Sequence, residues 1–78
     1  MSRADLTCSD LREANLQGAD VSGACLFQAS LCAADLRRVT FYGSNLSGAD
    51  LTDARCPGTD FRKANLRWAT MPDGTTRD

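Results

Sequence analysis

The sequence predicts an all-β solenoid, in which short straight sides wind around a narrow apolar axis. Two observations predict it. From Leu6 onward, every fifth residue is apolar or a cysteine over fourteen consecutive repeats. Two positions before each of these centres lies a small residue, with Val39 as the one larger exception. The fourteen centres are Leu6, Leu11, Leu16, Val21, Leu26, Leu31, Leu36, Phe41, Leu46, Leu51, Cys56, Phe61, Leu66 and Met71.

A period of five excludes the ordinary helix and the straight strand. A helix turns by about 100° per residue, so the centres would scatter around its surface. A straight strand alternates its side chains with a period of two, so successive centres would face opposite sides of a sheet. The pattern is consistent only if the chain bends once in each repeat and returns every centre to one interior. The small residues then leave room for one large side chain per repeat in a narrow, closely packed core.

The individual repeats carry a recognisable motif. Residues 4–8, 14–18, 34–38, 44–48, 49–53 and 64–68 read as alanine or serine, then Asp or Asn, then leucine and two variable residues. This motif resembles that of the pentapeptide-repeat family from residue 4 to about residue 73. The resemblance implies a right-handed quadrilateral β-helix with four repeats per coil. We expect about three and a half coils within residues 1–73, followed by a loose C-terminal tail at residues 74–78. Residues 71–75 also resemble a tail that follows the last repeat of bacterial members.

Four repeats per coil would place residues twenty positions apart in one column. Phe41 and Phe61 then lie on adjacent coils and can stack. Val39 is large for its position, and we expect it to widen its coil or to displace its neighbours. Residues 55–58 should form the least regular coil, because Pro57 lacks an N–H and Arg55 replaces the usual Asp or Asn.

Length and net charge limit the number of domains and the kinds of binding partner. A chain of 78 residues makes one domain, and its net charge of −1 favours neither a nucleic-acid binder nor a strong DNA mimic. No stretch reads as a signal peptide or a membrane span, so the default location is the cytoplasm.

The cysteines fit neither a metal site nor a redox motif. Cys56 occupies a centre and should be buried, whereas Cys8, Cys25 and Cys32 occupy outward positions. Their spacing matches no CxxC pattern, and the column register stacks none of them on another. We therefore expect reduced thiols, no bound metal and no cofactor.

No catalytic residue is predicted. The sequence has no histidine, and no base lies near a serine or threonine that it could activate. An acidic or amide residue precedes most centres and could form a cation-binding ladder, but we prefer a structural role in which it bonds to nearby backbone. These residues are Asp5, Asp10, Asn15, Asp20, Asp35, Asn45, Asp50, Asp60 and Asn65.

The outward positions offer a candidate partner-binding surface. Its basic members are Arg37, Arg38 and Arg55, and its aromatic members are Phe27, Tyr42 and Trp68. A second basic group, at Arg62, Lys63 and Arg67, lies around the last corner. The simpler interpretations are a solvated face whose arginines pair with Asp35, Asp53 and Asp60, and a Trp68 that covers the C-terminal end as a lid packed by the tail.

The sequence as a whole predicts a non-enzymatic, rigid structural or protein-interaction module. One alternative, suggested by the family resemblance, is a DNA mimic that modulates DNA gyrase. The short stack, the near-zero charge and the lack of a C-terminal dimerisation helix argue against it. A second alternative is an accessory domain of a longer protein. Because solenoid ends expose unpaired backbone, we also expect end-to-end association into a homodimer. Direct nucleic-acid or membrane binding is not expected.

Overall fold

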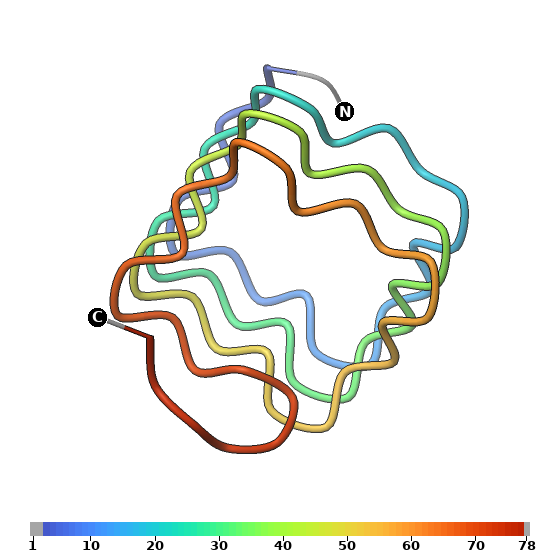
Figure 1. The fold of residues 1–78 in the computed structure, drawn as a ribbon, viewed down its shortest axis with the longest axis vertical. Coiled ribbons are helices and arrows are strands. Elements are labelled where there is room, and N and C mark those ends of the chain that lie inside the picture. The colour runs from blue at the N-terminus through green and yellow to red at the C-terminus, as the bar shows by residue number, and fades with distance from the viewer. Residues whose placement is uncertain (1–2, 78) are drawn as a thin grey trace.

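The backbone pairs with itself at intervals of twenty residues. The computed structural model describes residues 3–77, and within this range it contains no helix and no extended strand. Instead, single parallel bridges join Asp5 to Cys25, Asp10 to Ser30, Asn15 to Asp35 and so on to Asp50 with Thr70. A register of twenty with a repeat of five gives four repeats per coil. Figure 1 shows the resulting four-sided outline, in which successive coils lie on top of one another.

Each repeat contributes the same three hydrogen bonds to the coil below it. In the first repeat, the Leu6 N–H donates to the Cys25 carbonyl at 2.7 Å, and the Cys8 N–H donates to the Phe27 carbonyl at 2.9 Å. The Cys25 N–H returns a bond to the Ala4 carbonyl at 2.9 Å. Since this pattern recurs from repeat to repeat, the coils are held by a parallel β ladder, as the sequence predicts.

A tight turn follows every centre. The Ser9 N–H donates to the Leu6 carbonyl at 3.0 Å, and the equivalent bond recurs in the later repeats. The residue before the small one has a positive φ in all fourteen repeats, from 58° at Gln28 to 75° at Gly58. Five of these residues are glycines, which adopt this conformation without steric cost. The other nine residues carry a Cβ, and the sequence did not predict that they would adopt a positive φ.

The fourteen centres converge on one core, which confirms the central sequence prediction. Those of the middle coils, from Val21 to Leu51, are fully buried. The centres nearer the two ends are partly buried and pack against them. Phe41 and Phe61 stack with ring centroids 5.5 Å apart and planes inclined by 4°. The core is therefore a continuous column of apolar side chains that is more exposed at its two ends.

We name the four sides by their centres. The first side contains Leu6, Leu26, Leu46 and Leu66, and the second contains Leu11, Leu31, Leu51 and Met71. The third contains Leu16, Leu36 and Cys56, and the fourth contains Val21, Phe41 and Phe61.

The irregularity expected at Val39 is absent. Val39 is fully buried, yet its turn bond to Leu36 (3.1 Å) and its ladder bond from Asp60 (2.9 Å) both persist. Its column neighbours are Ala19 above and Thr59 below. The Thr59 hydroxyl is directed to the Leu36 carbonyl at 2.6 Å. The extra volume of valine is therefore accommodated beside the smaller Ala19 with the hydrogen bonds of its coil intact.

Residues 55–58 also keep the regular pattern, so the prediction of a distorted coil is wrong. Arg55 bridges to Asp35, and the Thr59 N–H donates to the Cys56 carbonyl at 2.9 Å. The N–H at the position of Pro57 takes no part in the ladder of any repeat. Cys56, expected to be buried, is partly exposed because it lies on the last coil of the third side.

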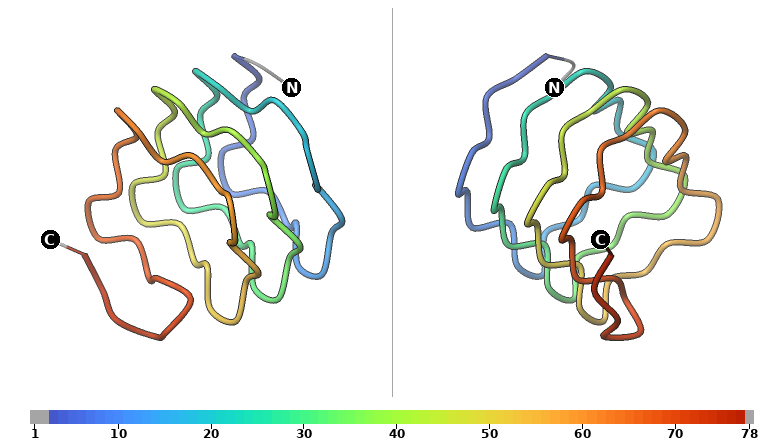
Figure 2. Two further views of the ribbon diagram at one scale, coloured as in Figure 1. Left: turned by 45° about the vertical axis from the view of Figure 1, so that its right-hand side comes forward. Right: turned by 60° about the vertical axis from the view of Figure 1, so that its left-hand side comes forward.

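The C-terminal tail is not loose over its described residues. Asp73 and Gly74 turn the chain back, and Thr76 pairs antiparallel with Thr70. The Trp68 N–H donates to the Arg77 carbonyl at 2.7 Å, and the Arg77 N–H donates to the Ala69 carbonyl at 2.9 Å. Figure 2 shows this segment, in dark red, folded back beneath the last coil. The tail thus adds a short strand to one side of the C-terminal end.

Candidate interaction surface

The polar residues before the centres have a structural role, as predicted. In each of the nine repeats with Asp or Asn at this position, the side-chain oxygen accepts from the N–H two residues later. Asp5, for example, accepts from the Thr7 N–H at 3.1 Å. This local bond satisfies a donor that the ladder leaves free. These Asp and Asn side chains therefore stabilise the turns through hydrogen bonds to the backbone.

Three of these carboxylates also bind an arginine two residues later. Asp10 pairs with Arg12 at 2.9 Å, Asp35 with Arg37 at 2.7 Å and Asp60 with Arg62 at 2.9 Å. The hydrogen bonds from the Arg37 side chain, the largest cause, lower the pKa of Asp35 to about 2. Those from Arg12 likewise lower the pKa of Asp10 to about 2. All three pairs are local and solvent-accessible, so each adds little to stability.

The repeat that contains Arg55 and Pro57 lacks both the acceptor and the donor of the turn bond. Arg55 has no oxygen that could accept from the N–H two residues later, and Pro57 has no N–H to donate. Pro72, the second proline, occupies the same place in its repeat, two residues after Thr70. Proline at this position fixes φ in the second residue of the turn and leaves no ladder bond unmade.

The six predicted surface residues do not form one patch. Arg37 and Arg38 lie on the third side, and Arg55 lies at the corner where that side begins. Phe27 and Trp68 lie on the first side and Tyr42 on the fourth. The third side is opposite the first in the four-sided outline (Figure 1). The arginines are therefore separated from Phe27 and Trp68, whereas Tyr42 lies on the adjacent side. Arg37 is already paired with Asp35.

Two of the three aromatic candidates, Tyr42 and Trp68, lie beside arginines of the second basic group instead. The Arg62 guanidinium lies over the Tyr42 ring at 5.7 Å from its centroid, and that of Arg67 lies over the Trp68 ring at 5.0 Å. Tyr42 is 46% exposed and Trp68 is 61% exposed. We name Tyr42, Arg62, Arg67 and Trp68 the aromatic corner. Tyr42 and Arg62 lie at the turn that ends the fourth side, and Arg67 and Trp68 lie at the turn that ends the first side. A spacing of twenty between Tyr42 and Arg62 was the sequence signal for it.

Trp68 does not act as a lid. Its side chain is 61% exposed, and the tail binds its backbone through the Trp68 N–H and the Arg77 carbonyl. Trp68 occupies the positive-φ position of its repeat, from which side chains point outward. The lid prediction is thus wrong, and the ring is available to a partner.

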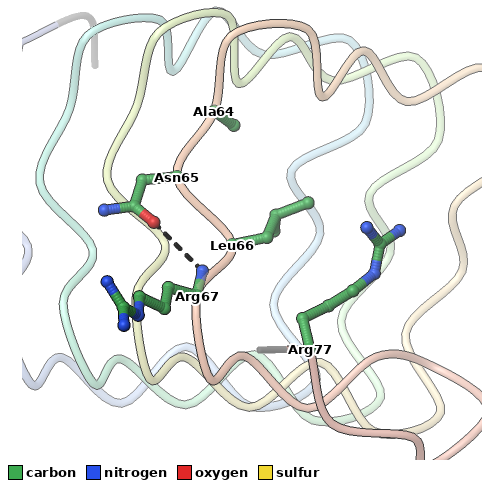
Figure 3. A pocket seen from close by; sticks show the side chains of 5 residues that line it. All are labelled: Ala64, Asn65, Leu66, Arg67 and Arg77. Carbon is green, nitrogen blue, oxygen red and sulfur yellow. Dashed lines mark hydrogen bonds between the residues drawn. The ribbon is translucent and has the colours of Figure 1, made fainter.

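An open hollow adjoins the aromatic corner at the C-terminal end. Ala64, Asn65, Leu66, Arg67 and Arg77 line it. Figure 3 shows the Arg67 and Arg77 side chains on opposite sides of Leu66, with the Asn65 amide oxygen bonded to the Arg67 N–H. Neither arginine is paired with a carboxylate among residues 3–77. The hollow is therefore positive, with an apolar floor.

The thiols are separate from one another. All four cysteines are free: Cys8 is exposed, and Cys25, Cys32 and Cys56 are partly exposed. Burial raises the pKa of the Cys56 thiol, which keeps it protonated. Within the described part of the chain, no three His, Cys, Asp or Glu side chains gather in a way that could hold a metal ion. The same residues include no helix of the length and apolarity that a membrane crossing requires.

Comparison with known proteins identifies the family. The family model described as pentapeptide repeats matches residues 1–31 and 29–71, with eight copies. The chain belongs to the pentapeptide-repeat family. No curated protein sequence matches it.

Two solved structures share the fold. One is HetL, a pentapeptide repeat protein involved in heterocyst differentiation regulation from the cyanobacterium Nostoc sp. strain PCC 7120. It is 32% identical over 97% of this chain, with a TM-score of 0.61, and the match spans 40% of HetL. The other is AT2G44920, a pentapeptide repeat protein from the Arabidopsis thaliana thylakoid lumen. It is 22% identical over 99% of this chain and 68% of its own, with a TM-score of 0.67. The chain thus spans two fifths of the length of HetL.

Proposed function

We propose that this protein is a non-enzymatic, rigid interaction module that binds a protein partner through the aromatic corner. The observation that carries the proposal is the pair of exposed rings, each covered by a guanidinium. Trp, Tyr and Arg are the residues that contribute most to protein interfaces. Here they stand on coils that hydrogen-bond to the coil before them, so docking orders little of the protein.

The separate roles of the five positions in each repeat support the same proposal. The centres and small residues fill the core, and the Asp and Asn side chains hold the turns, which leaves two outward positions per repeat for recognition. Two rows of variable side chains on every side can change without disturbing the fold. The relative HetL is involved in regulation, which is consistent with a binding role rather than a catalytic one.

Binding by paired variants tests the proposal. A partner recovered by co-purification from the native host is titrated against the wild type, Tyr42→Ala/Trp68→Ala and Arg37→Ala/Arg38→Ala. Loss of two hot-spot rings should raise Kd by roughly 700-fold, since each contributes about 2 kcal/mol. The arginine variant, which alters the turn that ends the third side, should bind as the wild type does. The proposal would be contradicted if the aromatic variant bound the partner with the Kd of the wild type. Circular dichroism checks that the variant is folded.

The finer fold description is part of the same proposal. We assign the winding a right-handed sense and about three and a half coils, in agreement with the family resemblance. We also propose a cytoplasmic location, supported by the four unpaired thiols, which suit a reducing compartment. A crystal structure tests the first assignment, and imaging of a tagged chain in the host tests the second.

A further inference from the structure

We propose that the C-terminal end of the stack is a docking surface for the N-terminal end of a second copy, and that tail residues 74–77 hold this surface closed. The partner is the chain itself, so this inference does not depend on the aromatic corner. It specifies which ends meet and what prevents them from meeting.

The two ends are complementary in their backbone hydrogen bonds. At the N-terminal end, the N–H and carbonyl groups of Asp5, Asp10, Asn15 and Asp20 have no backbone partner within residues 3–77. At the C-terminal end, the same holds for the N–H groups of Cys56, Phe61 and Leu66 and for the carbonyls of Ala54, Thr59 and Ala64. These are the groups that pair between successive coils. A second copy placed below would therefore continue the ladder in the register found inside the molecule.

The ends also match in charge. Residues 3–20 carry four carboxylates, Asp5, Asp10, Glu13 and Asp20, against two arginines. Residues 55–77 carry five cations, Arg55, Arg62, Lys63, Arg67 and Arg77, against two carboxylates. Contact of an acidic end with a basic end is attractive, whereas contact of two like ends is repulsive. This favours head-to-tail association over the symmetric pairing of two identical ends.

The apolar column is open at both ends. Leu6, Leu11 and Leu16 at one end are half-buried, in contrast to the fully buried leucines of the middle coils. Phe61 and Leu66 are half-buried at the other. Stacking two copies would cover these side chains as the inner coils cover theirs, which supplies the apolar part of the association.

The tail occupies the place of the next coil on one of the four sides. It satisfies the N–H groups of Trp68 and Met71, at 2.7 Å in both cases, and the carbonyl of Ala69. A second copy cannot lie flush against the other three sides while this strand is present. Tail residues 73–77 are all exposed, so little apolar contact holds them in place. The tail therefore covers backbone groups that could otherwise pair with a second copy, and a second copy can displace it.

Removal of the tail tests the inference. Sedimentation equilibrium is compared for the full 78-residue chain and a variant lacking residues 74–78, with circular dichroism as the check on folding. The truncated chain should associate with a Kd at least about tenfold lower than the full chain. Because a head-to-tail contact leaves each end free to continue, a series of species longer than the dimer should form. Arg77→Pro, which removes the bond to Ala69, should shift the full chain in the same direction.

A matched pair of charge variants in the truncated chain tests the polarity. Glu13 and Asp53 occupy the same position of the repeat on the second side, two coils apart. Glu13→Lys should weaken association and reduce its salt sensitivity, whereas Asp53→Lys, remote from the acidic end, should not weaken it. A truncated chain that is folded and monomeric at roughly 1 mM would overturn the docking surface. A full chain that associates as tightly as the truncated one would overturn the role of the tail.

Discussion

Replacing Ala33 by glycine should stabilise the protein, although glycine is normally the more flexible residue. Ala33 is exposed, its φ is 60°, and its N–H donates to the Thr52 carbonyl at 2.8 Å. A residue with a Cβ in this left-handed region costs about 1–2 kcal/mol relative to glycine. The substitution removes that strain and leaves the ladder bond intact, because the bond is made by the backbone.

The opposing effect is the greater freedom of glycine in the unfolded chain, which costs about 0.4–1 kcal/mol. The balance is a gain of about 1 kcal/mol, or a rise in Tm of roughly 4–8 °C for a domain of this size. Thermal unfolding followed by far-UV circular dichroism measures it.

Three further variants make the test specific. Gly43→Ala reverses the change at a φ of 68°, where an added Cβ meets no heavy atom within 4 Å, so it should lower Tm through strain alone. Gly48→Ala should lower it more, because its Cβ would also lie 3.2 Å from the Gln28 Cγ. Ser47→Gly, where φ is negative, should cost about 0.5–1 kcal/mol. A fall in Tm for Ala33→Gly comparable to that of Ser47→Gly would refute the reasoning.

Three other predictions follow from the same structure. The hydrogen-bonded carboxylates have lowered pKa values, to about 2 for Asp10 and Asp35. Their stabilising contribution is therefore complete above about pH 5 and is lost as the pH falls toward about 2, so the urea midpoint should fall over this range, and less so in Asp35→Asn. Arg55→Asp alone should gain no turn bond, because Pro57 has no N–H. Together with Pro57→Thr it should gain one, which a double-mutant cycle would detect as a favourable coupling of about 1 kcal/mol. The purified protein should leave supercoiling by DNA gyrase unchanged at micromolar concentration, whereas inhibition or protection would support the DNA-mimic alternative.

The core could be predicted from the sequence because its rule is local and repeated. Each of the centres from Leu6 to Met71 lies where the period of five places it, and the stacking of Phe41 on Phe61 follows from the register of twenty. The bonds of the Asp and Asn side chains were predictable for the same reason. Each involves only a residue and the backbone two positions later.

The features that the sequence did not predict depend on interactions between residues that are far apart in the chain. The left-handed φ of Glu13 or Lys63 carries no signal in the side chain, because the ladder and core compensate for the local cost. The effect of Val39 depended on the volumes of its column neighbours. The tail had a usable signal in Asp73 and Gly74, since this pair favours a tight reversal, but its pairing partner lies in the last repeat.

The exposed surface was predicted in its members but not in its grouping. Tyr42 and Trp68 were identified as outward residues, and the structure confirms their exposure. Their partners turned out to be Arg62 and Arg67 rather than the arginines of the third side. The register of twenty carries a signal for the pairing of Tyr42 with Arg62, and adjacency in the chain carries one for Arg67 with Trp68.

The division between inward and outward residues is tested most directly by comparing the urea unfolding of Leu36→Asp and Arg38→Ala. Leu36 is fully buried in the apolar column, so an aspartate there places an unpaired charge in the core and should leave the chain unfolded without denaturant. Arg38, two residues later, is exposed, and its loss should change stability by less than about 0.5 kcal/mol. Superimposable unfolding curves for the two variants would contradict a single apolar core lined by every fifth residue.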